Sequence, residues 1–323
     1  MQISVGTFNL NNLFSRFNFQ ADIDGIPPQE AGGIALTFLP DQVAVRTFMG
    51  RLVKAKPADA TAEVARRILD MDLDVLAVQE VEHVDILRQF NRDNLNGLYA
   101  EVALVEGNDP RMIDVGILSK LPIGPITSHQ AARHPGDPGR RVFGRDLLQV
   151  EIRKPDGSKA FTLYNTHLKS HFVPHDQDPV AGAAAANARR RRQAEMVADI
   201  ISRQERAGGK FILTGDMNDP EDSADLAPML VVDGQPLVDG LAAAAETRPP
   251  KPETPGQGPG PARPQWTHRF NPSGPEPPRY ELFDQIWLSQ GLAPHLVSAH
   301  IDRRTRHGGD GSDHDPAWVV LDL

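Results

Sequence analysis

The chain alternates short apolar runs with polar, turn-forming segments. Nine runs of six to nine residues are rich in Val, Ile, Leu and Phe, and each is bounded by Gly, Pro, Asp or Asn. Runs of this length and composition are typical of β-strands. We therefore predict strands at 3–10, 74–81, 99–106, 114–119, 146–153, 160–168, 210–217, 282–289 and 317–323.

Helical periodicity is confined to three segments, 58–71, 83–95 and 187–204, in which apolar residues recur every three or four positions. The predicted buried faces are Ala62, Ala65, Ile68 and Leu69 in the first, Val84, Leu87 and Phe90 in the second, and Ala194, Val197, Ile200 and Ile201 in the third. Many strands with few helices indicate α/β layers, in which two packed sheets have helices outside.

Two stretches lack either period. Residues 15–57 predict a loop-rich insertion. Between Pro249 and Pro278, eleven of thirty residues are proline, which excludes a central strand or a helix. A linker between domains is one interpretation, but only about 45 residues follow it, too few for a further domain. We expect a single domain over 1–323 with a Pro/Gly-rich surface loop near 247–279.

Composition excludes several classes of site. The net charge of −9, from 34 basic and 43 acidic residues, is not that of a protein that holds nucleic acid by bulk electrostatics, although a local site stays open. Without cysteine the chain has no disulfide, thiolate metal site or cysteine nucleophile. No apolar run approaches the ~18 residues that span a bilayer. We expect a cytoplasmic monomer, or a secreted one if a leader preceded the strand at 3–10.

Carboxylates, amides and imidazoles stand at the ends of several predicted strands. These residues are Asn9, Glu80, His167, Asp216, Asn218, Asp284, Asp313 and His314. Each of them taken singly has an ordinary alternative: Asn9 and the "GDMND" segment as turn residues, Glu80 as a solvated strand end and His167 as a buried core histidine. Gathered at one rim of a sheet, however, the acids would repel one another unless a cation lay among them. Mg²⁺ prefers such oxygen ligands, and histidine can neutralise charge on phosphorus or pass a proton. The set therefore suits metal-assisted hydrolysis of a phosphoester.

The strand-end motifs also resemble a known family. "TFNL", "LAVQEVE", "NTHLKSH", "LTGDMND", "FDQIWLS" and "SDHDP" follow the order and spacing of the signature segments of the endonuclease/exonuclease/phosphatase (DNase I-like) superfamily, in particular a bacterial branch. The resemblance spans Thr7 to Pro316. It implies a four-layer α/β sandwich, in which two mainly antiparallel sheets pack face to face between helices.

The resemblance also implies roles for individual residues. Glu80 would be the principal ligand of Mg²⁺, or of Mn²⁺ as the alternative, and Asp313 would complete the metal environment. Asn9 would lie near both metal and phosphate. Among the catalytic residues, Asp216 would orient or deprotonate the attacking water with Asn218 placing it, His314 would contact the scissile phosphate under the control of Asp284, and His167 would be a second phosphate-facing histidine or proton donor. Arg145 would bind a phosphate oxygen.

Two further features have ordinary interpretations. Asp315 follows His314 directly, and we expect it to be a turn residue and not a ligand. The run "RRRR" at 189–192 suggests a phosphate track, but consecutive helix residues point about 100° apart. We therefore expect these arginines to ring a solvated helix start.

Three functions compete. The first is a Mg²⁺-dependent phosphodiesterase that acts on nucleic acid. The second is a phosphatase or phospholipid-type phosphodiesterase with an inositol phosphate or a sphingomyelin-like substrate at the same site, which the net acidity favours slightly. The third, a non-enzymatic binding module, is disfavoured because every expected catalytic position holds a competent residue.

Overall fold

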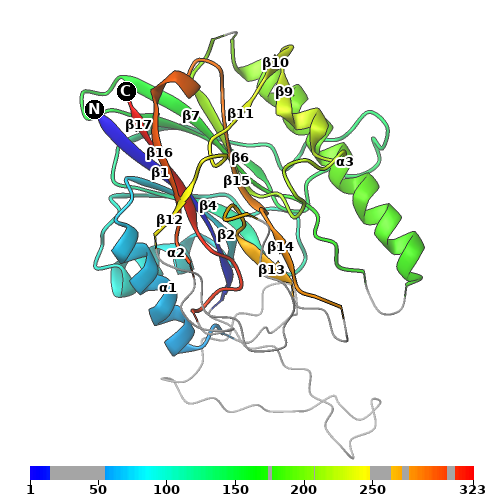
Figure 1. Cartoon of the computed structure of the whole chain (residues 1–323), viewed down its shortest axis with the longest axis horizontal. Coiled ribbons are helices and arrows are strands. Elements are labelled where there is room, and N and C mark those ends of the chain that lie inside the picture. Colours follow the sequence, from blue (N-terminus) through cyan, green and yellow to red (C-terminus); the bar gives the residue numbers. More distant parts are fainter. Residues whose placement is uncertain (15–54, 174–176, 207, 248–262, 271–275, 304–309) are drawn as a thin grey trace, which may run out of the picture.

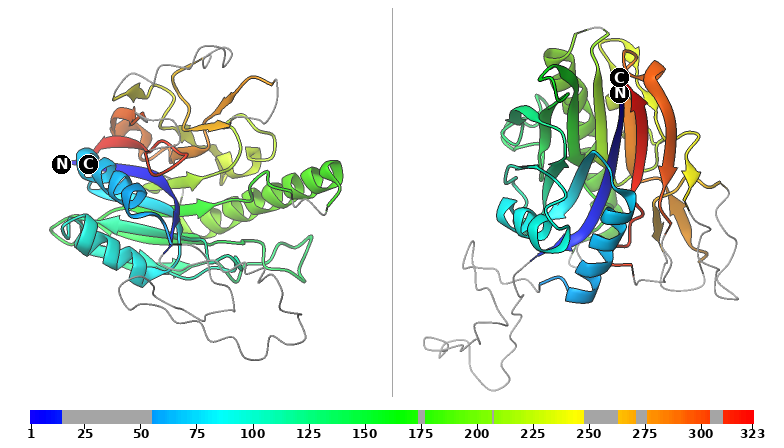
Figure 2. Two further views of the ribbon diagram at one scale, coloured as in Figure 1. Left: turned by 90° about the horizontal axis from the view of Figure 1, so that it is seen from below. Right: turned by 90° about the vertical axis from the view of Figure 1, so that its left-hand side faces the viewer.

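The chain folds into four layers, with two β-sheets packed face to face between helices (Figures 1 and 2). This computed structural model describes residues 1–14, 55–173, 177–206, 208–247, 263–270, 276–303 and 310–323. Most of the predicted insertion at 15–57 and much of the loop near 247–279 lie outside these residues. The α/β sandwich predicted from the motifs is confirmed, and most strand pairs are antiparallel.

The first sheet, sheet A, carries helices α1 (Ala58–Met71) and α2 (Val84–Asn94) on its outer face (Figure 1). Its strands, in spatial order, are β12 (Ala245–Glu246), β16 (Leu296–Ile301), β17 (Ala317–Asp322), β1 (Gln2–Leu13), β2 (Val75–Val81), β4 (Asp114–Ser119) and β3 (Glu101–Leu104). The neighbours β1 and β2 run parallel, so that their carboxyl ends meet at one edge.

The second sheet, sheet B, is covered by the long helix α3 (Pro179–Gln204) (Figure 1). Its strands, in spatial order, are β11 (Val238–Asp239), β15 (Asp284–Leu288), β8 (Phe211–Asp216), β7 (Lys159–His167), β6 (Leu147–Arg153) and β5 (Ile123–Ser128). Two small sheets complete the described strands, β9 (Val231–Val232) with β10 (Gln235–Pro236) and β13 (His268–Phe270) with β14 (Arg279–Glu281). Short 3₁₀ helices cover Ala227–Leu230 and Ala293–His295.

Three apolar clusters hold the layers together. The central one fills the space between the sheets and includes Val5, Leu163 and Ile286. A second seals α3 onto sheet B, and a third seals α1 and α2 onto sheet A. Each buried side chain of this size contributes about 1.5–3 kcal/mol relative to its exposure to water. None of the helices in the described ranges is long and apolar enough to cross a membrane.

The nine predicted strands are all present, because each apolar run is buried between the sheets or beneath a helix. The helix predicted at 187–204 begins earlier, at Pro179, with the carboxylate of Asp178 accepting from the amide of Ala181. Its first turns are alanine-rich and exposed, so they carry no apolar period, but proline at a first helical position after an acidic cap marks such a start. Four strands of the large sheets, β5, β11, β12 and β16, were not predicted.

The buried face of α1 differs from the prediction. Ala65 and Ile68 are buried as expected, whereas Ala62 is exposed and Arg67 is 1% exposed. Burial of an arginine among apolar neighbours requires ion-pair partners, because an unpaired buried charge is costly. The periodicity of apolar residues alone does not reveal such a position.

Arg67 belongs to a buried ion-pair network that holds the segment after His314. Its Nε lies 2.9 Å from Asp302 and its Nη2 lies 3.1 Å from Asp315. The other carboxylate oxygen of Asp315 lies 3.3 Å from Nη1 of Arg303, which also pairs with Glu246. Asp315 is fully buried, so the expected turn residue is instead the shared acid of two arginines. We refer to these residues as the Arg67–Asp315–Arg303 network.

Asp114, on β4, makes folding depend on pH. Burial, with Glu106 and Asp109 nearby, raises the pKa of its carboxyl to about 7. The folded protein therefore keeps a proton that the unfolded chain releases near pH 4, and the resulting stability is lost as pH rises from about 4 through 7. Asp114→Asn cannot ionise and keeps an oxygen that can accept from the amide of Gly107, 2.7 Å from the native carboxylate.

We expect Asp114→Asn to be more stable than the parent by about 1–3 kcal/mol at pH 8 and to lose that advantage near pH 4. Urea unfolding at several pH values measures the difference. Asp93→Asn, at an exposed carboxylate on α2, is the matched control. A constant difference across this range would show that Asp114 does not titrate as described.

Candidate active site

Sheet B brings three of the predicted residues into one row. His167 ends β7, Asp216 ends β8 and Asp284 begins β15. In the strand register His167 pairs with Asp216, and Asp284 pairs with Asp216 on the other side. All three side chains are buried. The Nε2 atom of His167 lies 3.4 Å from Oδ2 of Asp216.

The backbone around Asp216 has conformations that few residues tolerate. Gly215 has φ 132°, and a Cβ atom there would lie 1.9 Å from the carbonyl oxygen of Thr166, so only glycine fits. Asn218 has φ 53°, in the left-handed region that asparagine tolerates well. Its amide N–H donates to Oδ1 of Asp216 at 2.9 Å. This turn fixes the carboxylate of Asp216 at the sheet edge.

Sheet A contributes residues from two adjoining β-bulges. The register of β2 shifts between Gln79 and Val81 against β4, and that of β1 shifts between Asn9 and Leu13 against β2. Glu80, inside the first bulge, has φ 61°, an uncommon conformation for glutamate. A bulge re-aims a side chain out of the alternating pattern, and such strain is typical of functional sites. The partly exposed carboxylate of Glu80 accepts from the amide of Asn12 at 3.0 Å.

Asn9 joins the two sheets. Its Nδ2 atom donates to Oδ2 of Asp216 at 2.9 Å, and its Oδ1 accepts from the amide of Asn11 at 2.9 Å. Behind it, Gln79 donates to Asn165 of β7 at 2.8 Å, a second buried polar link between the sheets. The ends of β1 and β8 are thereby held at a fixed separation.

The segment before β17 supplies the last residues. The hydroxyl of Ser312 donates to the carbonyl of Asn9 at 2.7 Å and accepts from the amide of His314 at 3.0 Å. The Nδ1 atom of His314 lies 2.7 Å from Oδ2 of Asp284, and its Nε2 lies 3.9 Å from Oδ2 of Asp216. Asp313, which is exposed, accepts from the side chain of Asn11 at 2.9 Å.

The two histidines of the site have opposite electrostatics. Burial disfavours the charged form of His314, but Asp284 and Asp216 outweigh it and hold its pKa well above the ordinary value. For His167, burial and the nearby charge of Arg145 both lower the pKa well below that value. His314 is therefore a cation at neutral pH, whereas His167 is neutral. Burial also raises the pKa of Asp216, to about 7.

The acids of the site fit a divalent cation. Burial and the neighbouring charge of Asp313 both raise the pKa of Glu80, which means that the two carboxylates repel in the absence of a counter-ion. Ligand atoms of Asp313, His314 and His268 also lie within 4.8 Å of one another, a second grouping suited to a metal. Oxygen and imidazole ligands of this kind suit Mg²⁺ and Mn²⁺.

Sequence patterns did not identify two residues of the site, His268 and Lys56. His268, on β13, stacks on Phe283 with ring centroids 4.9 Å apart and faces the ring of His314 at the same separation. It lies in the Pro/Gly-rich segment, expected to be a loop. The Nζ atom of Lys56 donates to the carbonyl of Asn11 at 2.7 Å. Burial lowers its pKa to about 8 against the attraction of Asp313 and Glu80.

Arg145 is buried on the sheet B side of the site. Its Nη1 donates to the carbonyl of Leu168 at 3.2 Å, which also accepts from the side chain of Asn218 at 3.2 Å. Its Nε lies 3.4 Å from Asp109. The guanidinium lines a cleft of about 580 Å³ that also includes Arg111. Arg145 thus lies between the Asp216 turn and this cleft.

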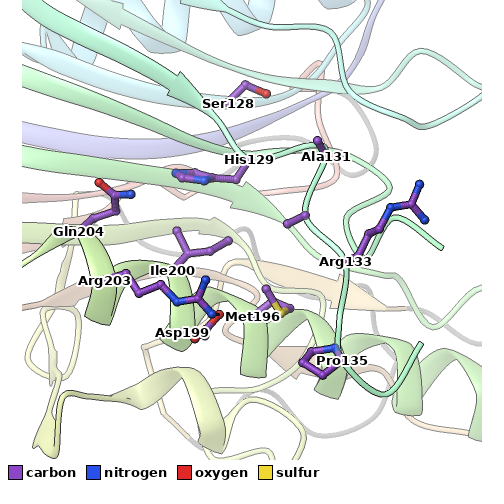
Figure 3. Close-up of a pocket in the computed structure, with 11 residues that line it drawn as sticks. Ser128, His129, Ala131, Arg133, Pro135, Met196, Asp199, Ile200, Arg203 and Gln204 are labelled. Atoms are coloured by element: carbon purple, nitrogen blue, oxygen red, sulfur yellow. Dashed lines mark hydrogen bonds and ion pairs between the residues drawn. The ribbon is translucent and has the colours of Figure 1, made fainter. Parts of the chain in front are cut away.

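A different cavity lies along the inner side of α3 (Figure 3). It has a volume of about 360 Å³ and is lined by Met196 and Ile200 of the helix and by residues that follow β5, such as His129. Asp199, which pairs with Arg203, is its carboxylate. None of the predicted site residues lines it.

Comparison with known proteins identifies a family. The sequence profile of the Endonuclease/Exonuclease/phosphatase family matches residues 6–314. No curated protein matches the chain. A solved endonuclease/exonuclease/phosphatase from Bacteroides vulgatus is 17% identical with a TM-score of 0.60, covering 100% of this chain and 99% of its own.

Two other similar structures bear more specific names. Truncated TDP2 of Caenorhabditis elegans is 17% identical with a TM-score of 0.55, covering 100% of this chain and 98% of its own. The mannosyl-6-phosphatase Bt3783 of Bacteroides thetaiotaomicron is 15% identical with a TM-score of 0.55, covering 99% of this chain and 100% of its own. The profile match over nearly the whole chain shows that the protein belongs to the Endonuclease/Exonuclease/phosphatase family of phosphoester hydrolases.

Proposed function

We propose that the protein is a Mg²⁺-dependent phosphodiesterase that cleaves nucleic acid. The observation that carries the proposal is the cluster of Asp216, the charged His314 and the neutral His167 at one edge of the sandwich, beside the repelling carboxylates of Glu80 and Asp313. Such a cluster can accept one proton, stabilise developing negative charge and hold a cation.

Glu80 and Asp313 would hold Mg²⁺, with Mn²⁺ as the alternative. Asn9 would contribute through the lone pair of Oδ1 that does not accept from Asn11. When bound, the metal polarises a phosphoryl oxygen and stabilises the leaving oxygen. The negative charges that repel in this chain are then balanced.

Asp216 is the residue we assign to the attacking water. Its pKa of about 7 lies near neutral pH, where a general base is most effective. The side chain of Asn9 and the amide of Asn218 each occupy one of its oxygens, so the carboxylate cannot rotate freely. Asn218 would also guide the water toward phosphorus.

His314 carries hydrogen on both ring nitrogens when charged. Nδ1 is committed to Asp284, which leaves Nε2 directed into the site to donate to a non-bridging phosphate oxygen. His167 is neutral and can donate or accept one proton. Arg145 would add a fixed positive charge on the far side of Asp216, where it is partly neutralised by Asp109.

A phosphatase acting on monoesters is the second candidate. One of the structures similar to this chain is called a mannosyl-6-phosphatase, and the net charge of −9 disfavours long-range attraction of DNA. The cleft beside Arg145 favours the phosphodiesterase, because its volume of about 580 Å³ and its basic side chains exceed what one phosphate group needs.

A substrate panel tests the proposal. The protein would be supplied with Mg²⁺ and bis(p-nitrophenyl) phosphate, p-nitrophenyl phosphate, single-stranded and duplex DNA, RNA, inositol phosphates and sphingomyelin. We expect cleavage of the small diester and of nucleic acid, and loss of both in EDTA. Preference for the monoester or an inositol phosphate would favour the phosphatase. Full activity in EDTA would refute the metal-dependent mechanism.

Glu80→Gln should weaken the metal site specifically. The substitution removes one negative charge but keeps the shape of the side chain, so we expect the Mg²⁺ concentration for half-maximal activity to rise about tenfold or more. Titration of activity against Mg²⁺ measures this shift. Glu106→Gln, at an exposed carboxylate after β3, is the control. An unchanged Mg²⁺ dependence in Glu80→Gln would place the metal elsewhere.

A further inference from the structure

A groove lined by basic side chains leads away from the candidate active site along α3. The cleft of about 580 Å³ that contains Arg145 adjoins a smaller one of about 90 Å³, and both are lined by Arg140, Arg189 and Arg192. We define the basic groove as these two cavities together. The larger one is lined by Arg111, Arg140, Arg145, Lys169, Arg189 and Arg192, and the smaller one adds Arg141. In Figure 2 (left) the N-terminal half of α3 extends beyond the sheet.

The charge of the groove is opposite to that of the whole chain. Its larger cavity has six basic side chains and one carboxylate, Asp109, whereas the chain carries a net charge of −9. Asp109 is already paired with Arg111 at 3.0 Å and lies 3.4 Å from Arg145. The smaller cavity adds one carboxylate, Asp137, and both Asp109 and Asp137 attract the guanidinium of Arg189. The groove therefore has a net positive charge, which an anionic ligand would balance.

Helix geometry explains how "RRRR" contributes to the groove. Arg189 and Arg192 are three residues apart and share one face. Arg190 points the other way and is fully buried, with its Nε 3.1 Å from Asp219, while Arg191 pairs with Glu195 at 3.3 Å. The run lies in the middle of α3, so the expected solvated helix start is wrong. Two of its four arginines face the groove.

The inner end of the groove reaches the chain directly after His167. Arg145 donates to the carbonyl of Leu168, the residue directly after His167. Lys169 comes next, and its Nζ donates to the carbonyls of Ser170 and Phe172 at 2.7 and 3.0 Å. Burial and the nearby arginines lower the pKa of Lys169 to about 8, so that it is still mostly charged at pH 7. A strand leaving the scissile position would pass over these cations first.

The aromatic side chain of Phe172 lines the groove beside these cations. Phe172 lines the larger cavity and is 60% exposed, the most exposed aromatic side chain among the described residues. Alternating cations and exposed aromatic rings are typical of proteins that bind single-stranded nucleic acid, since phosphates bind the cations and bases stack on the rings.

We propose that the basic groove binds a single-stranded nucleic acid segment that flanks the scissile phosphate, with Arg140, Arg189 and Arg192 on phosphates and Phe172 against a base. The proposal rests on the proposed phosphodiesterase function, and it adds the substrate class and the path of the strand. The acidic remainder of the surface keeps other polyanion contacts weak, so binding depends on this groove.

A binding experiment tests the groove without catalysis. Fluorescence anisotropy would measure the Kd of a labelled twelve-nucleotide oligothymidylate in EDTA. We expect Arg189→Ala/Arg192→Ala to raise Kd about tenfold or more and to reduce the slope of log Kd against log salt by about 1.4, since each phosphate contact on a single strand accounts for about 0.7. Arg88→Ala/Arg92→Ala, which removes two exposed arginines from α2, should leave both quantities unchanged.

The aromatic contact has its own test. Phe172→Ala should weaken binding about 5- to 100-fold, whereas Phe172→Tyr, which keeps the ring, should restore it. An oligomer of the same length that lacks bases should lose this dependence on Phe172. Equal affinities for the base-containing oligomer in all three proteins would overturn the stacking contact.

Hydrolysis separates this inference from the function on which it rests. In Arg189→Ala/Arg192→Ala, kcat/KM for an oligonucleotide should fall at least tenfold more than kcat/KM for bis(p-nitrophenyl) phosphate, mainly through KM. Equal losses on both substrates, or an unchanged oligonucleotide Kd, would overturn the groove. Failure of the parent protein to cleave any diester, with intact groove-dependent binding, would instead refute the phosphodiesterase.

Discussion

Asp216→Asn should lower kcat/KM for a small phosphodiester by about 10³-fold at pH 8. Asparagine has nearly the shape of aspartate, but it cannot take a proton from water. Its amide also replaces one oxygen, so it cannot accept from both Asn9 and Asn218. Activity should therefore fall while the fold persists, because a buried carboxyl whose pKa is raised to about 7 costs stability when it ionises.

Two measurements separate a loss of chemistry from a loss of folding in Asp216→Asn. Circular dichroism and thermal unfolding should show that Asp216→Asn melts at or slightly above the temperature of the parent at pH 8. Asp222→Asn, at an exposed carboxylate six residues later, should retain full activity. A loss of less than tenfold in Asp216→Asn would mean that another group activates the water.

Arg67→Ala should lower the free energy of unfolding by about 3–5 kcal/mol. The substitution leaves Asp302 without its Nε partner and removes one of the two arginines that neutralise Asp315. It also removes the guanidinium that lies 5.2 Å from the ring centroid of Phe8. An uncompensated buried carboxylate is far more costly than the intact pair is stabilising, so the loss is large.

Urea unfolding monitored by tryptophan fluorescence would measure this change. Arg66→Ala is the matched control, because Arg66 precedes Arg67 on α1 but pairs with Glu63 and Asp70 at the surface. Exposed pairs contribute about 0–1 kcal/mol, so the control should be nearly neutral. Similar losses in the two variants would show that helix propensity and not the network determines the effect.

Sequence patterns predicted the large features of the fold because those features depend on local order. An apolar run bounded by turn residues forms a strand wherever it is buried, and nine such runs did so. Asn9, Glu80 and Asp216 also had local marks, since each is the first polar residue after such a run or close to it. Their convergence at one edge follows from the family's strand order and could not be derived from the runs themselves.

The remaining features depend on contacts between distant parts of the chain. Arg67 meets Asp302 across 235 positions, and no period along α1 marks it as buried. His268 reaches the site from a proline-rich segment through a strand of three residues, too short to be predicted. The bulge at Glu80 is defined by the pairing of β2 with β4, and it adjoins a bulge in β1, so it is a property of paired strands and not of one run.

The position of Asp315 has a consequence for mutational studies. Its carboxylate pairs with two arginines, while the imidazole of the neighbouring residue, His314, faces Asp216 in the candidate active site. Replacement of Asp315 would remove the ion pairs that anchor this segment, and the imidazole of the neighbouring His314 would then be displaced. In a genetic screen such a variant would be scored as inactive, although its defect lies in the folding of this segment. Assays of soluble yield alongside turnover would be required to distinguish the two defects.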